Sequence, residues 1–164
     1  MRFSKRMTIS ACAALMVTFI VSACIPMGGT DFPKPDNGFT PKLTYAVSEG
    51  QAYQSVVAAL NANAIPIASG SPATGQITTD YIAGKSQLVG LGLVSADHTR
   101  YKYTVFIASH GKKLTSITVS CFLEISQSAT SGSTPFHDVS GENQEQVALL
   151  KNWLYQKIEQ QLAP

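Results

Sequence analysis

Hydrophobic residues recur at helical spacing in two stretches of the chain. The first stretch follows Ser48, and its apolar residues are three and four positions apart, as on one face of a helix. These residues are Tyr53, Val56, Val57 and Leu60. Ser48 and Gln51 have the spacing of a capping box, so the helix is predicted to begin there. The second stretch covers roughly residues 142–162 and has the stripe Val147, Leu150, Leu154, Ile158 and Leu162.

Between these helices, shorter segments alternate apolar and polar residues, as half-buried strands do. The predicted strands are residues 42–47, 64–68, 75–82, 101–108 and 114–125. In the third of them, Ile77, Thr79 and Tyr81 are predicted to share one face. The last is the strongest and places on one face Ile117, Val119, Cys121, Leu123 and Ile125.

Polar and glycine-containing segments separate these strands. Residues 69–72 and 109–112 predict turns, and residues 126–134 predict a flexible loop of low complexity. Residues 88–94 carry two glycines within an apolar run and fit either a weakened strand or a loop.

The order of the elements predicts a single α+β domain over residues 42–164. Connections of hairpin length join the later strands, so the sheet should be antiparallel. We expect four to five strands packed against two helices, in the order β-α-β-β-(β)-β-β-α, with one face of the sheet left open.

The first 23 residues have the order of a secretory signal peptide. Three cations, Arg2, Lys5 and Arg6, precede an apolar run that is shorter than the roughly 20 residues of a membrane span. The run ends at "VSAC", residues 21–24, which is typical of a bacterial lipobox. In such signals the cysteine receives diacylglycerol, becomes the new N-terminus and is usually acylated further, for example with palmitate. The alternative is ordinary signal cleavage nearby, with Cys24 incidental.

The segment after Cys24 predicts how the domain is held. Residues 25–41 contain four prolines and three glycines without periodicity, which is typical of a tether. Fully extended, it would reach roughly 50 Å. Two or more acyl chains give stable membrane anchoring, and Ile25, rather than an Asp, after the cysteine favours the outer membrane, with the domain in the periplasm.

Loss of residues 1–23 changes the charge and the cysteine count. The mature chain has nine Lys and Arg against ten Asp and Glu, so we expect no nucleic-acid partner. Cys12 leaves with the signal and Cys24 is the predicted lipid site, which leaves Cys121 without a partner for an internal disulfide. Its position on the apolar face of a strand favours a buried small residue over a reactive thiol.

Candidate catalytic groups are scattered along the chain. His98, His110 and His137 fall in segments predicted to be loops, so solvated histidines are the favoured interpretation. A metal site and a Ser-His-Asp triad are the alternatives, but no Gly-x-Ser-x-Gly motif is present to expose a serine. We therefore predict no enzyme, no catalytic or metal-binding residue and no cofactor.

One segment resembles a known family. Residues 43–82 combine Ala52, Val56, Ala59 and Leu60 on a helix with "AIPI" and then Gly75, Ile77 and Tyr81. This arrangement resembles the repeated domain of the BamC (NlpB) family, accessory lipoproteins of outer-membrane assembly. The resemblance implies a helix-grip fold and a role in the cell envelope, although the chain has room for one such domain where the family has two.

These patterns together favour a lipid-anchored, non-enzymatic module that binds an envelope protein or assists envelope assembly. The alternative is a binder of a small apolar ligand, held in a cavity between the long helix and the sheet. No motif identifies the partner-binding residues. Cations on the exposed edge are candidates because they would steer association, and these are Lys102, Lys112 and Lys113.

Overall fold

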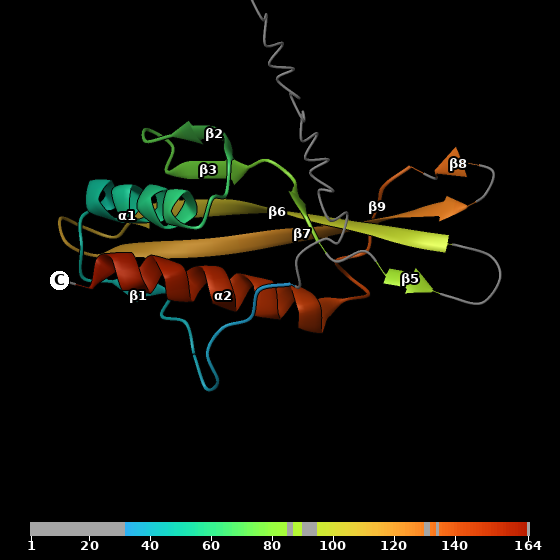
Figure 1. Ribbon diagram of the computed structural model, residues 1–164. Helices are drawn as coiled ribbons and strands as arrows, with labels where there is room; N and C mark the ends of the chain where they lie inside the picture. The colour runs from blue at the N-terminus through green and yellow to red at the C-terminus, as the bar shows by residue number, and fades with distance from the viewer. Residues whose placement is uncertain (1–31, 85–86, 90–94, 130–131, 134, 164) are drawn as a thin grey trace, which may run out of the picture.

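The computed structural model describes residues 32–84, 87–89, 95–129, 132–133 and 135–163. It contains one antiparallel sheet with two helices on one of its faces (Figure 1), which confirms the predicted α+β class. The elements are β1 (Thr44–Tyr45), α1 (Glu49–Ala62), β2 (Ile67–Ser71), β3 (Gln76–Thr79), β4 (Ile82–Ala83), β5 (Gln87–Val89), β6 (Ser95–Ser109), β7 (Thr115–Ala129), β8 (Gly132–Ser133), β9 (His137–Asp138) and α2 (Gln144–Leu162).

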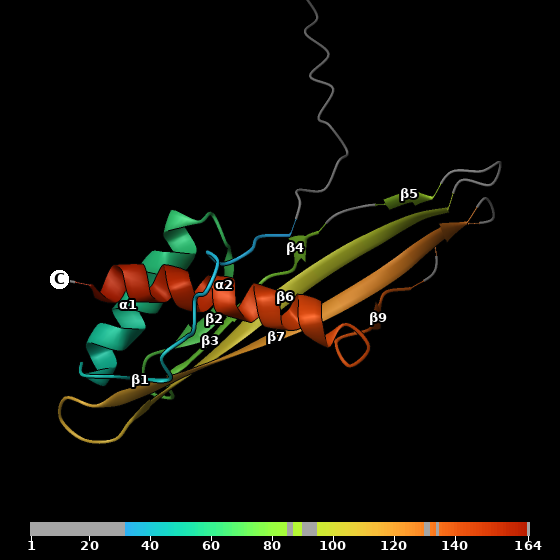
Figure 2. The same cartoon turned by 90° about the horizontal axis from the view of Figure 1, so that it is seen from below.

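Two long strands, β6 and β7, form the centre of the sheet (Figure 2). They pair in one continuous register, from Ala96 opposite Ser128 to Ser109 opposite Thr115. The strand order is β1-β7-β6-β3-β2, while β4 and β5 add to β6, and β8 and β9 add to β7. Because side chains alternate along a strand, the odd-numbered residues of both long strands face the helices and the even-numbered residues face the opposite side.

The odd-numbered face is the core. Tyr103, Val105 and Ile117 are fully buried, and the hydroxyl of Tyr103 donates to the carbonyl of Leu150 on α2 at 3.2 Å. The predicted stripe of α2 is confirmed at its centre, where three residues are fully buried: Leu150, Leu154 and Ile158. On α1 the buried face is rotated relative to the predicted one and includes small residues. It consists of Ala52, Ser55, Val56, Ala59 and Leu60, whereas Tyr53 and Val57 are only partly buried.

Both ends of α1 are closed by local hydrogen bonds. The hydroxyl of Ser48 accepts from the N–H of Gln51 at 3.3 Å, which confirms the predicted N-cap. At the other end, Ala64 has a φ of +54°, and the N–H of Ile65 donates to the carbonyl of Leu60 at 2.9 Å. This arrangement is a Schellman motif with alanine in the position that usually holds glycine.

Residues 32–42, which we call the strap, pack along α2. The N–H of Asp36 donates to the side-chain oxygen of Gln156 at 3.1 Å, and the amide of Gln156 donates back to the Asp36 carboxylate. Further along, the N–H of Lys42 donates to the carboxylate of Glu159 at 2.8 Å. Polar groups of four residues, two in the strap and two in α2, therefore satisfy one another.

The first residue of the strap lies against the sheet. The ring of Phe32 is 5.9 Å from that of Tyr101, and it approaches the backbone of Gly84 so closely that a Cβ there would be 2.6 Å from the ring. Residues 32–41 thus belong to the folded domain, which corrects the prediction of a free tether through residue 41. The remainder of that predicted tether, residues 25–31, lies outside the described residues.

Several other boundaries differ from the predictions, among them the start of β6, which lies at Ser95 rather than at residue 101. β2 includes residues 69–71, which were predicted to begin a turn, and the turn follows at residues 72–75. β7 continues to Ala129, into the predicted flexible loop, because β6 offers backbone partners as far as Ala96. β5 covers the first part of the ambiguous segment 88–94, and residues 90–94 lie outside the described residues.

The outer edge of β7 is closed by side chains of the helical layer. β1 and β9 pair with only the ends of this edge. Between them, the N–H of Val119 donates to the hydroxyl oxygen of Tyr155 at 2.9 Å, and this hydroxyl donates to the carbonyl of Ile117 at 3.3 Å. The hydroxyl of Ser140 accepts in the same way from Leu123 at 2.9 Å. Tyr155 of α2 and Ser140, which precedes α2, thus provide hydrogen bonds that a further strand would otherwise supply.

Replacing Tyr155 with Phe should lower the free energy of unfolding by about 1–3 kcal/mol, because a buried N–H and a buried carbonyl lose their partner. Urea unfolding of the two proteins measures this difference. Tyr53→Phe, at a partly buried tyrosine of α1, is the control and should cost less than about 0.5 kcal/mol. Equal losses in the two variants would contradict the role of the Tyr155 hydroxyl at the strand edge.

Candidate functional site

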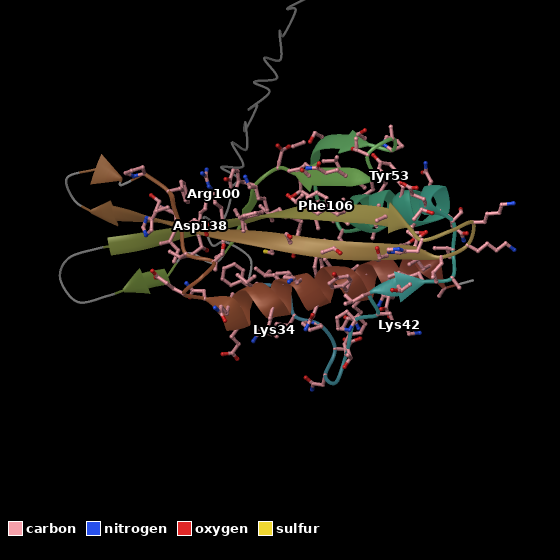
Figure 3. The ribbon with its side chains drawn as sticks, turned by 180° about the vertical axis from the view of Figure 1, so that it is seen from behind. Lys34, Lys42, Tyr53, Arg100, Phe106 and Asp138 are labelled. Atoms are coloured by element: carbon pink, nitrogen blue, oxygen red, sulfur yellow. The ribbon has the colours of Figure 1, made fainter. Side chains whose placement is uncertain are left out.

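Aromatic side chains gather on the face of the sheet that carries no helix. The exposed aromatic residues among those the structure describes are four, each between 37% and 45% exposed: Tyr81, Phe106, Phe122 and Phe136. Phe106 and Phe122 occupy even-numbered positions of β6 and β7, so they point away from the core. Arg100 lies on the same face of β6 (Figure 3).

Arg100 is held between two of these rings. Its guanidinium carbon is 3.9 Å from the ring centre of Tyr81 and 3.8 Å from that of Phe136. Its Nη2 lies 2.7 Å from a carboxylate oxygen of Glu124, and its Nε donates to the same oxygen at 2.8 Å. The hydroxyl of Tyr81 donates to the other oxygen of Glu124 at 2.6 Å. These contacts fix the guanidinium in both position and orientation.

Lys102 extends this arrangement along β6. Its ammonium lies 4.7 Å from the ring centre of Tyr81 and 5.7 Å from that of Phe122. We call the group of Tyr81, Arg100, Lys102, Phe122, Glu124 and Phe136 the open-face cluster. It combines an anchored cation, a second cation beside two rings, and a carboxylate whose hydrogen bonds are directed within the cluster.

Electrostatics favour the ionised form of the carboxylate. Burial tends to raise the pKa of Glu124, but the hydrogen bonds from Tyr81 and Arg100 and the charges of Arg100 and Lys102 outweigh it, so this pKa is lowered. At neutral pH Glu124 is therefore ionised and accepts hydrogen bonds rather than acting as a proton donor.

Tyr81 reaches this face through a shift in strand register. Thr78 of β3 pairs with Thr104 of β6, and Ile82 of β4 pairs with Tyr101 of β6. The β3–β4 side therefore has one more residue between these two pairs than β6 has. Such a bulge reverses the alternation of side chains. The prediction that Tyr81 shares the inner face with Ile77 is therefore wrong, since Tyr81 is 38% exposed and faces outward.

The hydroxyl of Thr79 compensates for this interruption. It accepts from the N–H of Tyr103 at 2.9 Å and donates to the carbonyl of Asp80 at 2.9 Å. A buried N–H in the middle of β6 would otherwise face the bulge without a partner. Threonine at this position thus permits the register shift that brings Tyr81 to Arg100.

The three histidines are not brought together. His98 lies in β6 and His137 in β9, so the prediction of loop positions is wrong for both, and β7 separates them. His110 lies in the turn after β6, where its Nε2 is 2.9 Å from the hydroxyl of Ser116. All three are exposed. Within the described ranges, no three His, Cys, Asp or Glu residues are close enough to hold a metal ion.

Cys121 is buried on the inner face of β7, as predicted. Burial raises the pKa of its thiol to about 12, and the charge of Lys151 lowers it only in part. The thiol is therefore protonated at neutral pH, which disfavours nucleophilic chemistry.

The three candidate cations separate into two places. Lys102 belongs to the open-face cluster, whereas Lys112 and Lys113 are exposed in the turn between β6 and β7. Sequence reasoning identified Lys102 but missed Arg100, Glu124, Tyr81 and Phe136. Arg100 and Glu124 meet only because they are opposite each other in the β6–β7 register.

No protein-family model matches the chain, and a search of curated proteins likewise found no match. In the part of the chain that the structure describes, neither helix is long and apolar enough to cross a membrane.

The lowered pKa of Glu124 predicts a pH-dependent contribution to stability. The ionised carboxylate stabilises the fold at neutral pH, and this contribution is lost as the pH falls below about 4 and through the lowered pKa. Glu124→Gln should therefore destabilise the protein at pH 7 by up to about 1 kcal/mol, since the pair is partly exposed, and the loss should be smaller at pH 3.

Urea unfolding of both proteins at the two pH values measures this difference. Glu142→Gln, at an exposed carboxylate before α2, is the matched control and should leave the free energy of unfolding unchanged at both pH values. A loss for Glu124→Gln that is the same at pH 3 and pH 7 would contradict the ionised network.

Proposed function

We propose that this protein is a lipid-anchored lipoprotein of the outer membrane whose domain faces the periplasm and acts as a non-enzymatic interaction module. Cys24 carries the anchor, and the open-face cluster is the contact surface for an envelope protein. The resemblance of residues 43–82 to the BamC family supports an accessory role in envelope assembly.

The observation that carries this proposal is the exposure of aromatic rings around a fixed arginine on a sheet face without helices. A single exposed aromatic residue needs no explanation, but four of them on one face, with Arg100 between two, have the composition of a protein-binding hot spot. Arg100 is already ordered by Glu124, so binding would cost little further side-chain entropy.

The packing beneath α2 disfavours the alternative of a small apolar ligand. Such a ligand would lie between α2 and the sheet, where Tyr103, Leu154 and Ile158 are all fully buried. The hydroxyl of Tyr103 also reaches the backbone of α2 at Leu150. Side chains thus occupy the space in which a cavity was expected, which favours the interaction module.

The strap supports action close to the membrane. Because Phe32 packs against Tyr101, only the seven residues 25–31 lie between the lipid-modified Cys24 and the folded domain. Fully extended, the chain from Cys24 to Phe32 spans roughly 26–29 Å, about half of the reach expected for a tether that ends at residue 41. A partner would therefore be met in the part of the periplasm next to the bilayer.

A photoreactive phenylalanine analogue at Phe122 tests the proposal in cells. It should form a discrete cross-link with one envelope protein, and Arg100→Ala should reduce that cross-link about tenfold, because the anchored cation is removed from the contact. The same analogue at Gln54, exposed on α1, is the control and should give no such product. Cys24→Ala should move the protein from the membrane fraction to the soluble periplasm.

Two results would contradict the proposal. Membrane association that persists in Cys24→Ala after signal removal would contradict the lipid anchor. A cross-link at Phe122 that is unaffected by Arg100→Ala, or that forms equally at Gln54, would contradict the open-face cluster as the contact surface.

A further inference from the structure

One end of the molecule combines exposed leucines with exposed lysines. This end is the turn between β6 and β7 with the neighbouring chain before β1, opposite to β5 (Figure 2). We call it the hairpin tip and define it by Lys42, Leu43, Lys112, Lys113 and Leu114. The exposed large aliphatic side chains in the described part of the chain are the two leucines, Leu43 at 60% and Leu114 at 44%.

The charges of the hairpin tip have one sign. All three of its lysines are exposed, and neither residues 37–48 nor residues 101–118 contain an Asp or Glu. The carboxylate of Glu159 lies beside the backbone of Lys42 and accepts hydrogen bonds from the Lys42 N–H and from the hydroxyl of Tyr45. Glu49 begins α1.

From this pairing of lysines and leucines we infer that the hairpin tip docks on the anionic headgroups of the bilayer to which the chain is anchored. This inference rests on the proposed lipid anchor at Cys24. Leucines inserted at the headgroup level with lysines around them are the composition of interfacial membrane contacts, and a basic patch is a recognised second signal beside acyl chains. A protein partner is less favoured here, since interfaces with proteins are poor in lysine.

The segment between Cys24 and the folded domain is long enough for such a contact. The chain enters the domain at Phe32, beside Tyr101, and the tip begins after Ser109 at the end of β6. Ser109 is eight positions after Tyr101 along the strand, a rise of roughly 26 Å. Phe32 is likewise eight positions after Cys24, and the chain between them can span roughly 26–29 Å, so the domain can stand on its tip while the anchor remains in the same bilayer. The open face would then be turned sideways, toward a neighbouring protein.

A fluorescent depth probe tests this orientation in the full lipidated protein. Leu114→Cys can be labelled selectively, because the thiol of Cys24 is modified and Cys121 is buried. The protein is reconstituted in phosphatidylethanolamine vesicles with and without phosphatidylglycerol, and a spin-labelled lipid quenches the probe. With phosphatidylglycerol, quenching at position 114 should be about twofold or more above that at a probe on Glu142→Cys, before α2.

Charge reversal gives the matched comparison. The double variant Lys112→Glu, Lys113→Glu should reduce quenching at position 114 to the level of the probe at position 142. The control is the double variant Lys34→Glu, Lys157→Glu, which makes the same change in net charge elsewhere. It should leave quenching at position 114 unchanged. Equal quenching at the two probe positions, in protein that floats with the vesicles, would overturn this inference alone. If the probe at position 114 becomes shielded only after an envelope protein is added, the tip contacts a protein, and the inferred contact with the bilayer is wrong. Failure of the unaltered protein to float would overturn both the anchor and the tip contact.

Discussion

The register between β6 and β7 determines both the core and the open face of this protein. Fourteen consecutive residue pairs join the two strands without interruption. Because side chains alternate, this register places Tyr103 and Val119 under the helices and Arg100 beside Glu124 on the opposite face. A shift by one residue would bury the charges and expose the core, so packing and surface chemistry specify the same pairing.

The same ladder determines which parts of the sheet can meet another molecule. On the outer side of β7, Tyr155 and Ser140 satisfy backbone groups between the short strands, so addition of a further strand there would displace existing hydrogen bonds. The terminal strand β2 is short and contains an irregularity between Ile67 and Ser69, which also disfavours strand addition. Binding through the open face, where the aromatic side chains lie, requires no such displacement.

Elements with a strong local pattern could be predicted from the sequence. The buried stripe of α2 and the alternation of β7 were predicted because apolar periodicity records which face is buried. Tyr81 could not be placed, since its orientation depends on a bulge that Thr79 supports through a residue in another strand, Tyr103. The strap was predicted as a tether because its prolines suggest a linker, whereas it is held by contacts such as that of Asp36 with Gln156, 120 residues away. The open-face cluster likewise joins residues that only the tertiary pairing brings together.

Thiol footprinting in intact envelopes can detect whether a protein covers the open face of β6 and β7, as we propose. Ser120→Cys places a thiol on this face, between the positions of Phe106 and Phe122, while Gln54→Cys places one on the outer surface of α1. With the partner in place, labelling at position 120 should be about tenfold slower in intact envelopes than in the purified protein, and labelling at position 54 should be unchanged. Equal labelling rates at position 120 in both preparations would contradict the account.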